Sequence, residues 1–205
     1  MESSLRRRQI RDCARKVFAE KGYHAATIDD IIREAGVARG TFYRHFDGKR
    51  AVFDQLLDEL FVSLELAIRR VDLADGAPPV VEQMLGNVGR VLGLLIDHED
   101  LTRILLREAV GIDDEFDRKI GEFYARILSL IELSLKHGQE MGIVRPCDTR
   151  LGAQIVLGSV RQVMESALES RRDPPSPDVL GRELLVLLAD GLFTSGLGGD
   201  EGGRA

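Results

Sequence analysis

We expect an all-α fold from three features of the sequence. Apolar residues recur every three or four positions along most of the chain, capping residues and glycines separate these stretches, and no segment shows the alternation typical of a strand. Together these features predict about nine helices. The chain of 205 residues is long enough for one large or two small domains with a hydrophobic core.

Basic residues are concentrated at the start of the chain. Residues 1–50 contain 12 Lys and Arg against 7 Asp and Glu, a net charge of +5, whereas the rest carries −11, which gives −6 overall. A basic head on an acidic body is typical of a protein that binds nucleic acid at one end. The arginines from Arg6 to Arg11 fit a phosphate-contacting arm, with a solvated helix face as the alternative.

Residues 27–46, TIDDIIREAGVARGTFYRHF, predict two short helices joined by a tight turn at Gly36-Val37-Ala38. Thr27 is a good N-cap, and Asp30 follows three residues later, which is close to a capping box with Asp in place of the usual Glu or Gln. Isoleucines at helical spacing give the first helix a buried side. Gly36 can take the left-handed conformation that ends it.

The second of these helices combines a buried face with a polar one. Phe42 and Phe46 are four residues apart and place one face in the core. The side chains that can donate hydrogen bonds to phosphates or bases are those of Arg39, Thr41, Tyr43, Arg44 and His45. Gly40 has no Cβ, so the backbone can approach a phosphate closely. This layout is typical of a helix-turn-helix, in which the second helix enters the major groove; an ordinary helical hairpin is the alternative.

Periodicity predicts six further helices. Their expected ranges are 49–71, 80–97, 99–110, 114–137, 149–169 and 177–193. The expected buried stripe of the first is Phe53, Leu57, Leu60, Leu64 and Ile68, and that of the fourth is Phe116, Ile120, Phe123, Ile127, Ile131 and Ser134. Gly111 and Asp113 separate the third and fourth, and Ser176 caps the last, with Pro177 at its favoured first position. The Gly-rich tail, residues 196–205, is expected to be disordered.

The segment from about Arg7 to Leu60 resembles the TetR family of bacterial transcriptional repressors. The resemblance rests on the first helix, RRQIRDCARKVFAEKGYHAATI, with Ala14, Phe18, Gly22 and Thr27 at the family's positions, on GVARGTFYRHF, and on Lys49 at the start of the next helix. One departure is Gly48-Lys49-Arg50, where the family usually has Ser-Lys-Glu. Without the Ser, Asp47 or Gly48 is expected to cap that helix.

The resemblance implies a ligand-responsive regulator, of the repressor type, that binds a palindromic operator in double-stranded DNA as a homodimer. It implies a helix-turn-helix domain at 1–48 and a ligand-binding and dimerisation domain at 49–195. The expected DNA contacts are Thr27, Arg39, Gly40, Thr41, Tyr43, Arg44, His45 and Lys49. A DNA-binding dimer without a small-molecule effector is the alternative.

The last two helices are apolar on several sides and contain small residues that allow close approach, such as Gly152 and Gly158. Periodicity leaves two interpretations open. The helices are buried inside one large domain, or they form a four-helix bundle between two protomers. The resemblance favours the dimer, because the family dimerises through its last two helices.

The helix at 80–97 carries glycines at 86, 89 and 93, close to one face. Each is less favourable than Ala in a helix interior by roughly 1 kcal/mol, so they indicate either tight packing or room for a ligand. Polar candidates for an effector pocket among these apolar helices are Asn87, Arg90, Arg103, Arg107, Tyr124 and Gln162. A mostly apolar pocket with few polar anchors suits a hydrophobic or amphipathic molecule.

The sequence lacks the motifs of the common enzyme classes. It has no HExxH, GxSxG, GxGxxG or P-loop, so we expect no catalytic site and no cofactor. The histidines are scattered, and Cys13 and Cys147 lie far apart, so we expect neither a metal site nor a disulfide. The N-terminus has no signal peptide and no apolar run approaches the length of a membrane span, which favours a cytoplasmic protein with no membrane partner.

Overall fold

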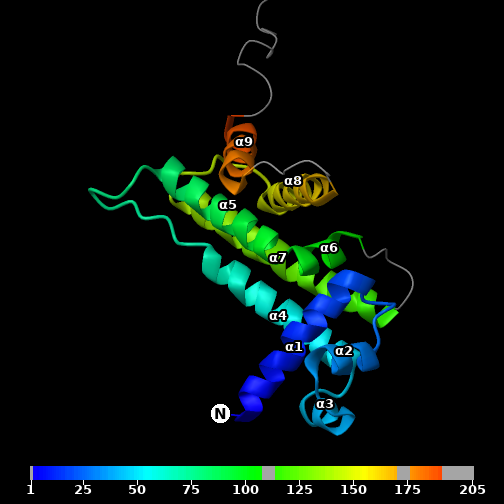
Figure 1. Cartoon of the computed structure of the whole chain (residues 1–205). Coiled ribbons are helices and arrows are strands. Elements are labelled where there is room, and N and C mark those ends of the chain that lie inside the picture. The colour runs from blue at the N-terminus through cyan, green and yellow to red at the C-terminus, as the bar shows by residue number, and fades with distance from the viewer. Residues whose placement is uncertain (1, 108–113, 170–175, 191–205) are drawn as a thin grey trace, which may run out of the picture.

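The computed structural model describes residues 2–107, 114–169 and 176–190, and within these ranges all regular structure is helical (Figure 1). The helices are α1 (Glu2–Lys21), α2 (Ile28–Ala35), α3 (Arg39–His45), α4 (Lys49–Ala67), α5 (Val80–Asp97), α6 (Glu99–Arg107), α7 (Asp114–Glu140), α8 (Thr149–Glu169) and α9 (Pro177–Asp190). The expected all-α fold is confirmed. The features expected at Gly111, Asp113, Leu192-Phe193 and 196–205 lie outside the described residues.

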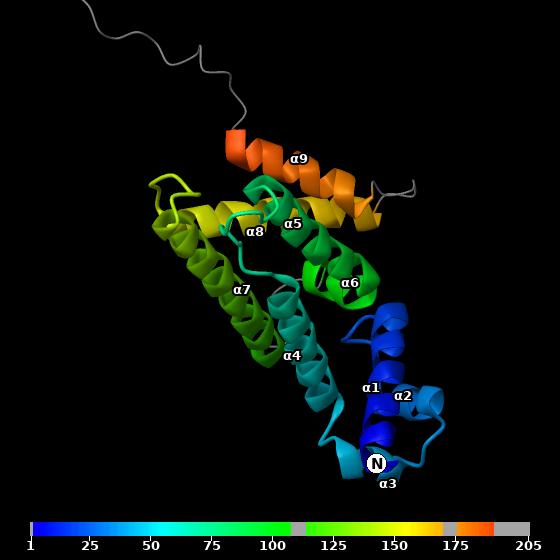
Figure 2. The same ribbon diagram turned by 90° about the vertical axis from the view of Figure 1, so that its left-hand side faces the viewer.

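The first three helices form a head at one end of the molecule, with α8 and α9 at the other (Figures 1 and 2). In the head, α1 packs on α2, and α2 on α3. The side chains at the centre of this core, Ile10, Phe18, Ile31 and Phe42, are completely buried. Truncating a buried phenylalanine to alanine typically costs about 3–5 kcal/mol, so this small core depends on each ring.

Helix α4 connects the head to the body. Four residues of its predicted stripe, Phe53, Leu57, Leu60 and Leu64, are buried and belong to the same cluster as the head core. The fifth, Ile68, is half-buried and follows the last residue of the helix. The hydrophobic core is therefore continuous across residue 48, the boundary expected from the sequence.

The predicted end of this helix at Val71 is wrong, because α4 ends at Ala67. The physical reason is tertiary. The side-chain amide of Asn87 accepts a hydrogen bond from the backbone N–H of Arg69 and donates one to its carbonyl, each at 2.8 Å. Arg90 Nε donates to the Ala67 carbonyl, also at 2.8 Å. These bonds hold the chain after Ala67 in a non-helical conformation and satisfy backbone groups of Ala67 and Arg69.

One other predicted boundary differs, since α7 continues past His137 to Glu140. The helix predicted at 99–110 is described as far as Arg107, and its expected end lies outside the described residues. Of the stripe predicted for α7, Phe116 and Phe123 are buried, whereas Ser134 is exposed and donates to the Leu130 carbonyl one turn earlier. The chain reverses at Gly142, whose φ of +71° is in the left-handed region.

A second buried cluster lies where α5, α8 and α9 meet, formed by Leu92, Met164, Leu168 and Leu184. Here α5 and α9 cross closely. A Cβ on Gly181 would lie 3.2 Å from Val88 Cγ1, and one on Gly89 would lie 3.4 Å from Asp178 Oδ1. Gly89 therefore takes part in tight helix packing, and a larger residue there would push against α9 and not into a ligand site.

The head docks on the body at two places. Tyr23 stacks on Phe116 of α7 with ring centroids 4.5 Å apart, and Phe53 stacks on the same ring at 5.2 Å. At the second place, Arg15 Nη1 of α1 lies 3.1 Å from His98 Nδ1, at the corner between α5 and α6. Burial and the neighbouring Arg15 lower the pKa of His98, although Asp97 and Asp100 act in the opposite direction. Neutral His98 can therefore accept a hydrogen bond from Arg15.

This arrangement predicts an acid sensitivity of stability. The unfolded chain binds a proton at His98 more readily than the folded chain, so stability should decrease as pH falls below the ordinary histidine pKa of about 6.5. The melting temperature, measured from pH 7.5 to 5.5, should fall less for His98→Gln, which keeps an acceptor for Arg15 but does not titrate. The exposed His137→Gln is the control and should follow the wild type. Superimposable curves for His98→Gln and wild type would contradict the assignment.

Candidate nucleic-acid interface

The expected capping box is present at the start of α2. Thr27 Oγ1 accepts a hydrogen bond from the Asp30 N–H, and Asp30 Oδ2 accepts one from the Thr27 N–H, both at 3.1 Å. Lys21 Nζ lies 2.7 Å from Asp30 Oδ1. Lys21, together with Thr27, lowers the pKa of Asp30 to about 2. The aspartate is therefore ionised at neutral pH and fixes the end of α1 to the start of α2.

The turn and the second helix also match the sequence prediction. Gly36 ends α2 with φ +61°, in the left-handed region. On α3, Phe42 and Phe46 are buried against the head core. Both views place α3 at the end of the molecule farthest from α9 (Figures 1 and 2). The two phenylalanines fix the helix to the head, and its remaining residues are available to the outside.

The predicted contact residues of α3 differ in exposure. Arg39, Gly40, Tyr43 and Arg44 are exposed, whereas Thr41 and His45 are half-buried. A Cβ added to Gly40 would meet no atom within 4 Å, so no packing constraint requires glycine there. The exposed positions form a surface of hydrogen-bond donors with the width of one helix, which fits the major groove.

Arg39 has a partner that the sequence did not indicate. Its Nη2 lies 3.0 Å from Asp29 Oδ1 on α2, and both side chains are more than 60% exposed, at 63% and 64%. An exposed ion pair of this kind contributes at most about 1 kcal/mol, whereas a bidentate arginine–guanine contact discriminates by about 1–3 kcal/mol. The pair can therefore hold Arg39 in place without preventing it from binding a base.

Lys49 has a structural role in this geometry. Its ammonium donates to the carbonyls of Tyr23, His24 and Ala26 at 2.7, 3.3 and 2.9 Å, and lies 4.4 Å from the centroid of the Tyr23 ring. These contacts give the expected phosphate contact no support. Lys49 instead closes the turn between α1 and α2. Gly48 is the N-cap residue of α4, and no side chain caps that helix.

The basic segment at the N-terminus forms the first turns of α1 and not an extended arm. Arg7 Nε donates to Gln55 at 3.0 Å, and its guanidinium lies 4.8 Å from the centroid of the Phe46 ring. Arg8 is more exposed, at 73%, and lies 3.8 Å from Asp12 one turn along α1. Phosphate contact by Arg6 and Arg8 stays a prediction, whereas Arg7 also helps to hold the end of α3 against α4.

Most of the residues predicted for the effector pocket have partners within the protein. Asn87 and Arg90 hold the chain after α4, and Arg103 pairs with Glu99 along α6 at 3.5 Å. Gln162 is exposed on α8, and the Arg107 side chain lies outside the described residues.

Tyr124, the remaining pocket candidate, is half-buried. Its hydroxyl donates to the Leu105 carbonyl at 2.8 Å, and burial raises the pKa of this hydroxyl. The bond joins α7 to α6, so Tyr124 is accounted for by contacts within the protein.

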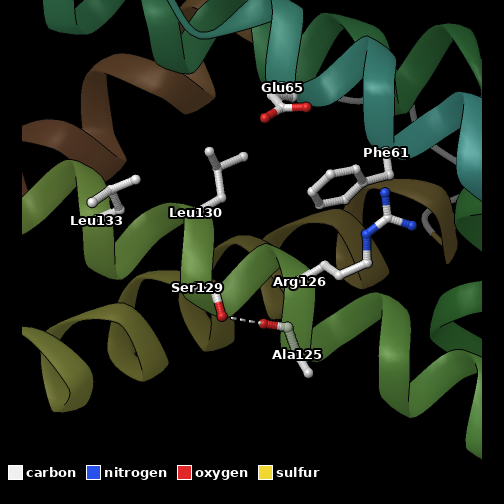
Figure 3. Close-up of a pocket in the computed structure, with 7 residues that line it drawn as sticks. All are labelled: Phe61, Glu65, Ala125, Arg126, Ser129, Leu130 and Leu133. Atoms are coloured by element: carbon white, nitrogen blue, oxygen red, sulfur yellow. Dashed lines mark hydrogen bonds between the residues drawn. The ribbon is translucent and has the colours of Figure 1, made fainter.

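A hollow of about 400 Å³ lies elsewhere, between α4 and α7 (Figure 3). Its lining residues are Phe61, Glu65, Ala125, Arg126, Ser129, Leu130 and Leu133. None of the five predicted residues whose side chains the structure describes lines it. Arg126 was missed because an arginine among alternating polar and apolar residues of a helix has the pattern of an ordinary surface position.

A helix-turn-helix with an exposed, donor-rich second helix on a basic head defines a DNA-binding protein. The family model for bacterial regulatory proteins of the tetR family matches residues 10–56. The HTH-type transcriptional repressor AcnR of Corynebacterium diphtheriae is 32% identical over 70% of each chain.

Solved structures support the same assignment across the body. The fatty acid degradation regulator FadR from Bacillus halodurans is 29% identical, with a TM-score of 0.77 over 91% of this chain and 96% of its own. FadR from Bacillus subtilis, solved in complex with stearoyl-CoA, shares the fold, with 24% identity and a TM-score of 0.72 over 90% of this chain and 98% of its own.

The chain belongs to the TetR family of bacterial regulatory proteins. It is therefore a DNA-binding transcriptional regulator. Within the described residues, no helix is long and apolar enough to span a membrane.

The position of Arg39 leads to a test of base recognition. Arg39→Lys keeps the charge but loses the bidentate geometry, so it should relax the binding-site profile at one base pair while leaving the salt dependence nearly unchanged. Arg39→Ala should relax the same position, at a loss of about 1–3 kcal/mol per contact, and also flatten the salt dependence. Selection from a random duplex library measures both. Arg33→Ala on α2 is the control for the loss of one positive charge. An unchanged binding-site profile for both Arg39 variants would exclude base recognition by Arg39.

Proposed function

We propose that the protein is a homodimeric repressor of a palindromic operator, released from DNA by an amphipathic acyl compound that binds the body. One observation carries the proposal: helix α4 belongs to both the head and the body. Its first half packs in the head with Phe18, and its second half lines the hollow against α7. A ligand in the body can therefore act on the orientation of the head through one continuous helix. In this proposal, residues 1–48 recognise DNA, and residues 49–195 bind the ligand and dimerise.

Exposed apolar residues support dimerisation through α8 and α9. Those about half exposed on these helices are Leu151, Ile155, Val179, Val186 and Leu187. Both helices lie at the end opposite α3, so a two-fold contact there leaves both heads free. Exposed apolar side chains on two neighbouring helices favour a protein–protein contact.

Leu184 is not part of that exposed set. It is buried against Leu92 and Met164 within one protomer, so a charge at this position would test folding and not dimerisation. Val186 and Leu187 are the residues of α9 through which the dimer contact can be tested.

The dimer also satisfies the geometry of DNA recognition. One recognition helix reads too few base pairs for specificity in a genome, whereas two heads related by a two-fold axis read two half-sites. Major-groove half-sites on one face of the duplex lie about 34–36 Å apart, or a multiple of that distance. The operator is therefore expected to be a palindrome whose spacing matches the distance between the two α3 helices.

Relatives and local chemistry support an acyl compound as the effector. One related regulator is named for fatty acid degradation, and another was solved with stearoyl-CoA. The hollow between α4 and α7 combines Phe61, Leu130 and Leu133 with charged groups at its edge. An apolar chain with a polar head matches such a surface. To release DNA, the ligand must bind more tightly to the conformation that does not fit the operator.

The test is operator binding by fluorescence anisotropy with lauroyl-CoA and palmitoyl-CoA. Either compound, below its micellar concentration, should weaken operator affinity within the roughly 5–150-fold range of allosteric coupling. CoA without an acyl chain and dodecyl maltoside are the controls for the head group and for detergent action. If neither acyl compound changes the affinity of a dimer that binds the operator, the alternative of a DNA-binding dimer without this effector is correct.

A further inference from the structure

The hollow between α4 and α7 has an apolar floor and one half-exposed cation. Figure 3 shows Leu130 and Leu133 along one wall and Phe61 beside the guanidinium of Arg126. Leu133 is 51% exposed, so the apolar surface that it forms with Leu130 is in contact with water in the free protein. A volume of about 400 Å³ lies within the range of small-molecule sites.

Arg126 is held in position but not saturated. Its guanidinium lies 3.7 Å from the centroid of the Phe61 ring, and Nη1 donates to Asp58 Oδ1 at 2.8 Å. Across residues 2–107, 114–169 and 176–190, this is the only hydrogen bond that the Arg126 side chain donates. A guanidinium has further N–H donors in a fixed fork, which are suited to a second oxyanion.

The charges around Asp58 favour an anionic ligand over a cationic one. Lys119 Nζ of α7 also approaches Asp58 Oδ1, at 3.8 Å. Two cations of α7 therefore converge on one carboxylate of α4, so these three groups together carry a net positive charge beside the hollow. The Asp58 and Arg126 side chains are 52% and 44% exposed, so their ion pair is weak and can exchange with an anion from solution.

We propose that Arg126 anchors the anionic head of the acyl effector, in exchange for Asp58, while the acyl chain covers Leu130 and Leu133. This proposal rests on the proposed function and assigns the site of its ligand. The shared chemistry is an oxyanion at one end of an apolar chain, supplied by a fatty carboxylate or by the phosphates of an acyl-CoA. Glu65, exposed on the α4 side of the hollow, disfavours the reverse orientation because it would repel the head group.

The exchange gives the ligand a direct effect on α4. Asp58 joins α4 to α7 through Arg126 and Lys119. When the ligand anion takes the place of Asp58 at Arg126, the ionic contact between Arg126 and α4 is lost while the acyl chain occupies the space between the two helices. The second half of α4 is then free to move relative to α7, and the first half carries the head with it.

The experiment compares three variants with three twelve-carbon probes. Arg126→Gln removes the anchor, Asp58→Asn removes its competitor, and Arg118→Gln removes an exposed arginine of α7 that pairs with Glu122 as the matched control. The probes are laurate, lauroyl-CoA and dodecanol. For each combination of variant and probe, calorimetry measures binding to the DNA-free protein. Anisotropy measures the probe concentration at which half of the operator is released. Melting temperatures verify that each variant is folded.

Arg126→Gln should raise the half-release concentration of the anionic probes by about tenfold and leave dodecanol unchanged. Asp58→Asn should lower the half-release concentration of the anionic probes, and Arg118→Gln should leave it unchanged. If Arg126→Gln raises the half-release concentration of laurate alone, the group bound by Arg126 is a carboxylate. If it raises that of lauroyl-CoA alone, the group is a phosphate of CoA. If Arg126→Gln is poorly folded, Arg126→Lys takes its place and should weaken the anionic probes by a smaller factor, since it keeps the charge and loses the fork.

Failures of the two proposals are distinguishable. If the anionic probes release wild-type protein from the operator and Arg126→Gln changes laurate and dodecanol equally, the anchor is wrong and the proposed function stands. If no probe releases the operator but laurate binds with the expected dependence on Arg126, the anchor is correct and the effector function is wrong.

Discussion

The structure depends on the packing of α1, α4 and α7 around one group of aromatic rings. Phe53 of α4 lies between Phe18 of α1 and Phe116 of α7, with centroid distances of 5.9 and 5.2 Å, and Tyr23 contacts all three rings. Aromatic pairs at these distances add about 0.5–1.5 kcal/mol each beyond the area that they bury. The head has no core separate from α4, so a change in the position of α4 is also a change in the head.

Lys49 closes this arrangement from the DNA-binding side. Its ammonium satisfies three carbonyls at the end of the first helix–turn segment and covers the face of Tyr23. Buried carbonyls without donors are costly, so the lysine is needed to fold the turn whether or not DNA is present. A residue at a family motif position thus acts here on the shape of the head, whereas Arg39 and its neighbours on α3 form the exposed surface that we propose meets DNA.

Local signals in the sequence were sufficient for the recognition unit. The Thr27–Asp30 capping box, the left-handed Gly36 and the buried pair Phe42 and Phe46 all appear where periodicity and capping rules place them. Each of these features is set within about four residues of chain, which is the range over which such rules apply. The helix types and most boundaries follow for the same reason.

Features that depend on distant parts of the chain could not be predicted in this way. The end of α4 is set by Asn87 and Arg90, about twenty residues further along, a structural role that their local sequence does not indicate. The role of Gly89 depends on α9, and Arg126 is distinguished only by Asp58 and Phe61 on another helix. Sequence periodicity identifies the face of a helix, whereas the identity of its partner requires the fold.

The central claim is that ligand and operator select different spacings of the two heads through α4. Its most direct measurement is the distance between spin labels at the exposed position Glu20, with Glu20→Cys introduced after Cys13→Ser and Cys147→Ser. We expect one narrow distance on operator DNA and a distinct distance with lauroyl-CoA, with both present in the free dimer. The absence of dipolar coupling, or one distance distribution under all three conditions, would contradict the claim.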